Sequence, residues 1–303
     1  MEIFNSWIAL ALLGPLFWTL SDFIDKLVID AHTKGIFDFL FSFSLTSWLC
    51  LLLLILWFGI PSFSSHGAIA IGLGFATTTS FYFYARGLQY TDTSLAILTF
   101  KLVPILAILF AWLFFSATIE LRELLAASIV LGGAGYLFLN IEGGRLKISK
   151  GLSWILLAVA MWAVIFVLAD HILKSIPFSE YMVFDTLGAS LVTLPLLLMP
   201  NARREIHAGI RSATPAKYGW FFLNTFSDFL AQVCLKKAFS LAPTVGIVSV
   251  VTQIQSIYGI LTGILLTLLF PRVISEDISP RNLLRKLTGT LIIVFGIYIA
   301  LIK

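Results

Sequence analysis

The chain contains ten apolar segments that each approach the length of a membrane-spanning helix, and this pattern limits its possible folds more than any other feature. An α-helix needs about 20 mostly apolar residues to cross the hydrocarbon core of a bilayer. The ten predicted spans are Trp7–Ile29, Ile36–Phe58, Ala68–Leu88, Thr93–Phe115, Leu124–Leu139, Leu152–Leu173, Tyr181–Met199, Tyr218–Phe239, Val245–Phe270 and Leu284–Ile302. Because short connections join these segments, we expect an all-α integral membrane protein without a separate soluble domain.

The composition supports this fold class. Of the 303 residues, 59% are hydrophobic and only 12% are charged, whereas soluble domains have about 45–50% apolar and 25% charged residues. The first apolar segment has neither a basic stretch before it nor a small-residue cleavage site after it, so we expect a retained helix rather than a signal peptide. Cys50 and Cys234 lie inside apolar segments and are interpreted as packing residues rather than a disulfide or metal ligands.

Lysine and arginine are divided unequally between the two sides of the predicted bundle. One side has thirteen: Lys34, Arg86, Arg145, Lys147, Lys150, Arg203, Arg204, Arg211, Lys217, Arg272, Arg281, Arg285 and Lys286. The side with both termini has five: Arg122, Lys174, Lys236, Lys237 and Lys303. Since cytoplasmic loops carry the basic excess, the count places both termini outside the cytoplasm in a plasma (inner) membrane. The net charge of +4 then reflects topology, and we expect no nucleic-acid partner.

The two halves of the chain resemble each other weakly. The first span opens with a Ser-Trp-Ile sequence at Trp7 and the sixth does so at Trp154, while an offset of 151 residues aligns Lys101 with Thr252. Five helices are an odd number, so the second half must insert in the opposite direction. We therefore predict two inverted five-helix repeats, whose interface near the membrane midplane is where transporters of this kind bind substrate. The predicted repeats are residues 1–144 and 145–303.

Three motifs resemble those of a known family. Trp18–Lys26 closes the first span with an aromatic residue, small residues and a lysine, and Tyr84–Ala96 forms a polar hairpin that is followed by Pro104. Gly132–Gly135 makes the fifth span glycine-rich. In these motifs, and over nearly its whole length, the chain resembles the drug/metabolite transporter superfamily, and within it the EamA-type ten-helix exporters.

The resemblance implies a transporter with ten helices and cytoplasmic termini, the opposite orientation to that given by the basic residues. The chain departs from the family pattern at two connections. Ser116–Glu120 replaces the usual Gly-Glu pair, and Gly59–His66 lacks the usual basic residues.

The eighth predicted span has polar residues on one face. Asn224, Asp228 and Gln232 are spaced four apart, which stacks them on a helix. Asn224 and Gln232 alone are equally typical of hydrogen bonds between membrane helices. Asp228 is different, because a charge at bilayer depth costs roughly 2.5 to 3.5 kcal/mol and is normally kept for a pathway or a bound ion. We therefore predict that Asp228 binds substrate or exchanges a proton against it.

Lys101 is interpreted as the one basic residue deep within a span. Either it forms a permanent ion pair, with Asp228 as one partner, or it binds a carboxylate or phosphate of the substrate or competes with a proton. A buried ion pair is weak evidence for stability, so the functional interpretation is preferred. Thr252 and Gln253 share a face of the ninth span and are predicted to add neutral hydrogen-bond partners in a mostly apolar pocket.

Three further residues complete the predicted site. Asp22 lies one helical turn deeper than Asp25 and Lys26, and is predicted to be a gate or a proton site. Tyr82 and Tyr258 lie in the third and ninth spans, where their rings could stack on a substrate or hydrogen-bond to it.

The sequence therefore predicts a secondary active transporter that moves a small polar or amphipathic organic metabolite by alternating access. We expect it to be driven by protons or by exchange, with export favoured over uptake, as a monomer or a homodimer in the lipid bilayer. It contains no P-loop motif and no His-x-x-His pair, so we expect no metal, no cofactor and no enzymatic activity. A membrane-embedded enzyme and a non-transporting membrane subunit are the alternatives.

Overall fold

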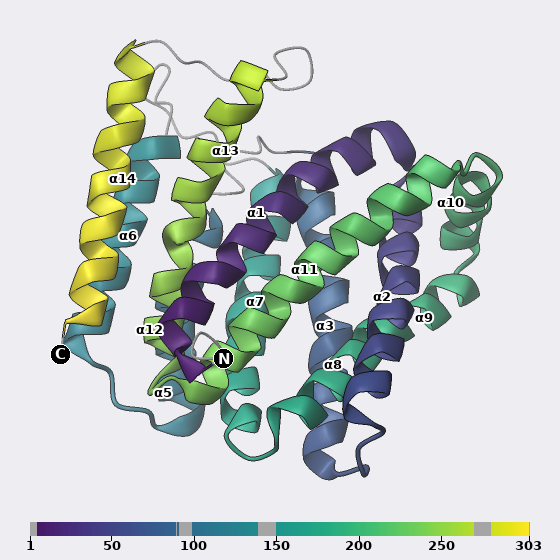
Figure 1. Ribbon diagram of the computed structural model, residues 1–303, viewed down its shortest axis with the longest axis horizontal. Helices are drawn as coiled ribbons and strands as arrows, with labels where there is room; N and C mark the ends of the chain where they lie inside the picture. The colour runs from purple at the N-terminus through teal and green to yellow at the C-terminus, as the bar shows by residue number, and fades with distance from the viewer. Residues whose placement is uncertain (1–4, 89, 91–98, 139–149, 270–279, 303) are drawn as a thin grey trace.

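The computed structural model describes residues 5–88, 90, 99–138, 150–269 and 280–302, and every regular element among them is helical (Figure 1). The helices of the first half are α1 (Trp7–His32), α2 (Ile36–Phe58), α3 (Ser65–Leu88), α5 (Val103–Phe115) and α6 (Leu121–Phe138). Those of the second half are α7 (Lys150–Leu173), α8 (Phe178–Leu191), α9 (Thr193–Leu198), α10 (Pro200–Arg211), α11 (Pro215–Leu241), α12 (Val245–Val251), the 3₁₀ turn η2 (Thr252–Ile254), α13 (Gln255–Leu269) and α14 (Pro280–Leu301).

Side-chain caps fix the starts of three helices. The hydroxyl groups of Ser6, Thr214 and Thr244 accept hydrogen bonds from backbone N–H groups three residues later, at the starts of α1, α11 and α12. The first N–H groups of a helix have no partner within the helix, and an unpaired donor is costly where water is scarce. These caps therefore define where the chain enters each helix.

The predicted all-α membrane fold is confirmed. Among the residues that the structure describes, seven helices or helix runs are long and apolar enough to cross a membrane: α1, α2, α3, α7, α8 with α9, α12 with α13, and α14. α5 is a shorter apolar helix. α6 and α11 were also predicted spans; α6 begins with Arg122 and Glu123, and α11 carries several charged residues. Each of the ten predicted spans overlaps a described helix.

Three predicted spans are less regular than expected. The seventh is divided at Val192 into α8 and α9, and the ninth is interrupted by η2. In the fourth, a turn at Lys101 and Leu102 precedes α5, while residues 93–98 lie outside the described part of the chain. Hydropathy does not reveal the break at Val192, because this residue is as apolar as those around it, whereas the other two breaks contain the polar residues Lys101, Thr252 and Gln253.

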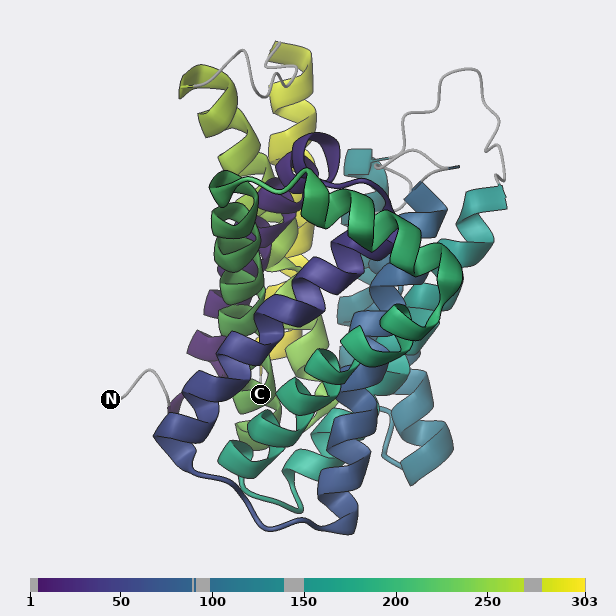
Figure 2. The same ribbon diagram turned by 90° about the vertical axis from the view of Figure 1, so that its right-hand side faces the viewer.

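One helix was not predicted from the sequence, because it lies between the seventh and eighth predicted spans. Residues 200–211 form α10, which buries Ala202, Ile206 and Gly209 on one face. Their spacing of four and three residues is the helical pattern that could have revealed it. Figure 2 shows α10 lying crosswise near the start of α2; in the chain it connects α9 to α11.

The helices pack mainly with partners from the other half of the chain. α1 lies along α11, α3 lies along α7 and α8, and α6 lies along α14 (Figure 1). A close crossing lies between α3 and α8, where a Cβ atom on Gly74 would clash with the backbone of Asp185, and one on Gly188 with the backbone of Ile71. Small residues let membrane helices approach in this way.

Candidate functional site

A small polar cavity lies among α2, α3, α8 and α11. Its water-accessible space is about 40 Å³, room for a few water molecules at roughly 10–15 Å³ each but not for an organic solute. Its charged lining residues are Asp185, Asp228 and Lys236, and the rings of Phe43, Phe81 and Phe229 form part of its wall. The cavity therefore combines fixed charges with aromatic surface inside the bundle.

Asp185 of α8 and Lys236 of α11 form an ion pair in the cavity wall. The hydroxyl of Tyr181 donates a 3.3 Å hydrogen bond to Asp185, and the Lys236 ammonium lies 5.6 Å from the centre of the Tyr181 ring. Only 3% of Lys236 is exposed. Lys236, which the sequence analysis assigned to the side of the membrane with both termini, is therefore a buried basic residue like Lys101.

Asp228 lies on the same wall, with 8% of its surface exposed. Its Oδ1 accepts a 3.1 Å hydrogen bond from the Trp18 indole N–H of α1. Lys236 forms its ion pair with Asp185 rather than with Asp228. The three charged groups thus comprise two carboxylates and one ammonium, and Asp228 carries the excess negative charge.

The two neighbours of Asp228 in the predicted polar stripe have different surroundings. Asn224 is fully buried between α1 and α11, where it accepts a hydrogen bond from Ser21 at 2.7 Å and donates one to Asp25 at 2.6 Å. Gln232 lines the cavity, and its side-chain nitrogen finds no hydrogen-bond partner among the described residues. Within the stripe, Asn224 therefore contributes to packing between helices, whereas Asp228 and Gln232 line the cavity.

Lys101 does not line this cavity. It is buried at the turn before α5, 5% exposed, and its electrostatic partner is Asp22 of α1. Within the described residues it forms no ion pair with Asp228, which was one of its two predicted roles. Asp22 also accepts a 2.8 Å hydrogen bond from Gln255 of α13. Lys101 and Asp22 thus belong to a second polar cluster, which also contains Gln255.

The remaining predicted site residues are dispersed. The side chains of Thr252 and Gln253, in η2, both donate to the backbone carbonyl of Ser249, which satisfies part of the interrupted helix. Tyr82 stacks on Phe37 at 5.5 Å between ring centres. Tyr258 is half-buried on α13. None of these four side chains lines the cavity that contains Asp228.

The sequence contained a signal for the missed ion pair. Lys236 lies eight residues after Asp228, so it continues the stripe of Asn224, Asp228 and Gln232 at the same spacing of four. For Asp185 the signal is weaker, because a carboxylate about two turns into α8 is equally typical of a surface position. Only the packing of α8 against α11 brings the two charges together.

Apolar helices that surround buried charge are typical of multi-pass membrane proteins that move solutes. Residues 5–139 match the model of the EamA-like transporter family. This match supports membership of the drug/metabolite transporter superfamily and a membrane transporter of the EamA type. The matched region corresponds to the first of the two predicted repeats.

Solved structures share the fold. One crystal structure of a protein is 15% identical and superposes with a TM-score of 0.66 over 96% of this chain and 96% of that chain. At this identity the similarity concerns the fold alone. No curated protein sequence matches the chain significantly.

Proposed function

We propose that this transporter is a secondary active transporter that moves a small polar or amphipathic organic metabolite by alternating access. The observation that carries the proposal is the buried cavity with Asp185, Asp228 and Lys236 in its wall. Placing charge inside a membrane protein is costly, and such groups usually line a substrate or ion pathway. A subunit with a purely structural role would not need these charged residues, because apolar side chains would pack there at a lower cost.

The unbalanced charge supports coupling to protons or exchange. Lys236 forms its ion pair with Asp185, so Asp228 has a neutral donor, the Trp18 N–H, and no ion-pair partner among the described residues. A proton, or a positively charged group of the substrate, would supply the missing charge. The nearby rings of Phe43, Phe81 and Phe229 suit an amphipathic solute, since aromatic faces attract both apolar groups and cations.

The packing partners support two inverted repeats, residues 1–144 and 145–303. The first helix of each half lies along the third helix of the other half, α1 on α11 and α7 on α3. The last helices, α6 and α14, lie along each other. The fourth helix of each half is interrupted at positions that the 151-residue offset aligns, Lys101 and Thr252. In such transporters the two repeats rock against each other around a fixed site.

The size of the cavity supports movement during transport. With about 40 Å³ of water-accessible space, this conformation excludes an organic substrate, so α2, α3, α8 and α11 must separate to admit one. Movement of one half of a bundle against the other exposes a central site to one side of the membrane at a time.

The basic residues support a plasma (inner) membrane protein with both termini outside the cytoplasm. Lys217 and Lys236 are buried in ion pairs and no longer count as loop charges. Without these two residues, twelve lysine and arginine residues lie on the α10 side and four on the side with both termini, so the excess on the α10 side remains. Export is favoured over uptake by the family resemblance, and the transporting unit is proposed to be a monomer or a homodimer.

The test is transport by the purified protein in liposomes. Radiolabelled metabolites, including amines, amino acids and organic acids, would be presented with and without a proton gradient. Gradient-driven flux of one class, lost on Asp228→Asn substitution, is the expected result. Chemical conversion of a solute, detected by mass spectrometry, would indicate an enzyme. Absence of flux for every class, from protein that remains folded, would indicate a non-transporting subunit.

A further inference from the structure

The amphipathic helix α10 presents a basic face on the outside of the protein. Its exposed basic side chains are Arg203, Arg204, His207 and Arg211. At 100° per residue these four lie within one third of the helix circumference, opposite Ala202, Ile206 and Gly209 on the buried face. Lys34, exposed in the connection before α2, adds a charge nearby. We call these five residues the α10 basic face.

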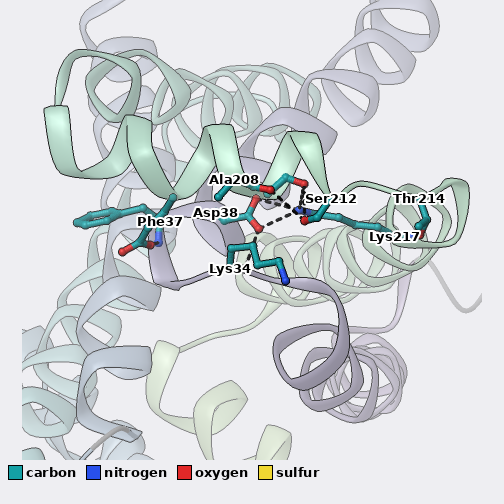
Figure 3. Close-up of polar contacts among 9 residues, drawn as sticks. Lys34, Phe37, Asp38, Ala208, Ser212, Thr214 and Lys217 are labelled. Carbon is teal, nitrogen blue, oxygen red and sulfur yellow. Dashed lines mark hydrogen bonds and ion pairs between the residues drawn. The ribbon is translucent and has the colours of Figure 1, made fainter.

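No acidic side chain of α10 neutralises this face. The one acidic residue of the helix, Glu205, is turned inward and accepts a 2.9 Å hydrogen bond from the backbone N–H of Phe37, at the start of α2. Asp38 is likewise occupied, because it forms a buried ion pair with Lys217 at 2.8 Å (Figure 3). The basic side chains are therefore left to attract an external anion.

The position of α10 suggests what that anion is. The helix follows directly on α9, where Leu194, Leu197, Leu198 and Met199 are exposed hydrophobic residues at the end of a spanning segment. It then runs crosswise to the spans rather than continuing along them (Figure 2). A short helix with this placement lies at the level of the lipid headgroups, and long arginine side chains can extend to reach them.

We infer that the α10 basic face binds the headgroups of anionic phospholipids. Positively charged segments next to a membrane span are attracted to the negative surface of the cytoplasmic leaflet. This agrees with the basic excess, which places the α10 side at the cytoplasm. The inference needs a membrane protein only and does not depend on the substrate or coupling proposed above.

The contacts of α10 connect this surface to the cavity. The Lys217 ammonium donates hydrogen bonds to both Asp38 oxygens, at 2.9 and 2.8 Å, and to the backbone carbonyl of Gly209 at 3.2 Å. Three helices thus meet at one buried cluster: α2 through Asp38, α10 through Gly209, and α11 through Lys217. Because α2 and α11 also line the cavity, lipid that holds α10 in place also holds the ends of two cavity helices.

The test compares lipid binding to the purified full-length chain in detergent. Fluorescent phosphatidylglycerol and phosphatidylcholine would be titrated against the wild type and the variant Arg203→Gln/Arg204→Gln/Arg211→Gln. The wild type should prefer phosphatidylglycerol, and the triple variant should bind it weaker by about fivefold or more, because each basic residue near a lipid surface contributes on the order of that factor. The matched control, Asn201→Gln/Ala208→Gln, changes exposed residues of the same helix without changing charge and should behave as the wild type.

Salt provides a measurement that does not depend on any variant. The preference of the wild type for phosphatidylglycerol should fall as ionic strength rises, since exposed charges are screened. An unchanged preference in the triple variant would overturn the inference, and so would a preference that salt does not affect. Equal binding of both lipids by the wild type, with polyglutamate binding that the triple variant loses, would also overturn it and would indicate an acidic protein partner.

Discussion

The indole N–H of Trp18 donates a 3.1 Å hydrogen bond to the carboxylate of Asp228, and so joins α1 to α11 at the wall of the cavity. The two helices belong to different proposed repeats. A rocking movement between the repeats would therefore stretch or break this bond. Protonation of Asp228 would weaken it as well, because an N–H donor binds a carboxylate more strongly than a neutral acid. The bond thus offers a direct way to link proton binding to movement.

Replacing Asp228 with Asn should abolish proton-driven transport, because the amide keeps the size of the carboxyl group and cannot exchange a proton. The measurement is uptake into liposomes as a function of external pH, with the amount of folded protein as a reference. Asp170→Asn is the matched control, since Asp170 of α7 forms an ion pair with Lys174, just past the end of that helix, and does not line the cavity. A pH dependence equal to that of the wild type in Asp228→Asn would contradict the proposed role.

Substituting Gly74 with Ala should destabilise the protein by about 1–3 kcal/mol, the usual effect of overpacking a tight contact. The new methyl group would clash with the backbone carbonyl of Asp185 and would push α3 away from α8. Gly72→Ala is the control from the same helix, because a Cβ atom there meets nothing within 4 Å. The melting temperature in detergent measures both. Equal melting temperatures would show that α3 and α8 are not in close contact.

The stability lost when the buried ion pair of Asp38 and Lys217 is broken should depend on whether one or both charged side chains are replaced. Their side chains are 1% and 4% exposed. Lys217→Met alone leaves a buried carboxylate without its partner and should destabilise by about 3–5 kcal/mol. The double variant Asp38→Leu/Lys217→Met removes both charges and should recover much of this loss. Thermal unfolding of both variants tests the prediction, and a double variant less stable than the single one would refute it.

Cys50 should report the opening of the cavity. Its thiol lies in the cavity wall and is 1% exposed in this conformation, so small water-soluble thiol reagents should modify it slowly. In a Cys234→Ser background, conditions that drive transport should increase the rate of modification. The reciprocal variant, Cys50→Ser, keeps Cys234, which packs close to Gly14 between α1 and α11, and should stay unreactive. A rate at Cys50 that never changes with transport would argue against alternating access.

The polar side chains show where prediction from sequence ends. Asp228 was identified because a carboxylate in the middle of an apolar segment is conspicuous whatever surrounds it. Its hydrogen-bond donor, Trp18, lies 210 residues away, and nothing in a local pattern indicates that pairing. Lys101 was predicted on the same grounds as Asp228, yet the turn before α5 directs it to Asp22.

The sequence by itself determined the all-helical membrane fold, because the length and apolarity of each segment decide whether it can span a bilayer regardless of its neighbours. The sequence also shows which charged residues lie within apolar segments, where burying a charge is costly. Only the tertiary structure decided which of them share a cavity. Asp185 and Lys236 meet, and Gly209 lies against Asp38, because helices far apart in the chain pack closely where small residues allow it.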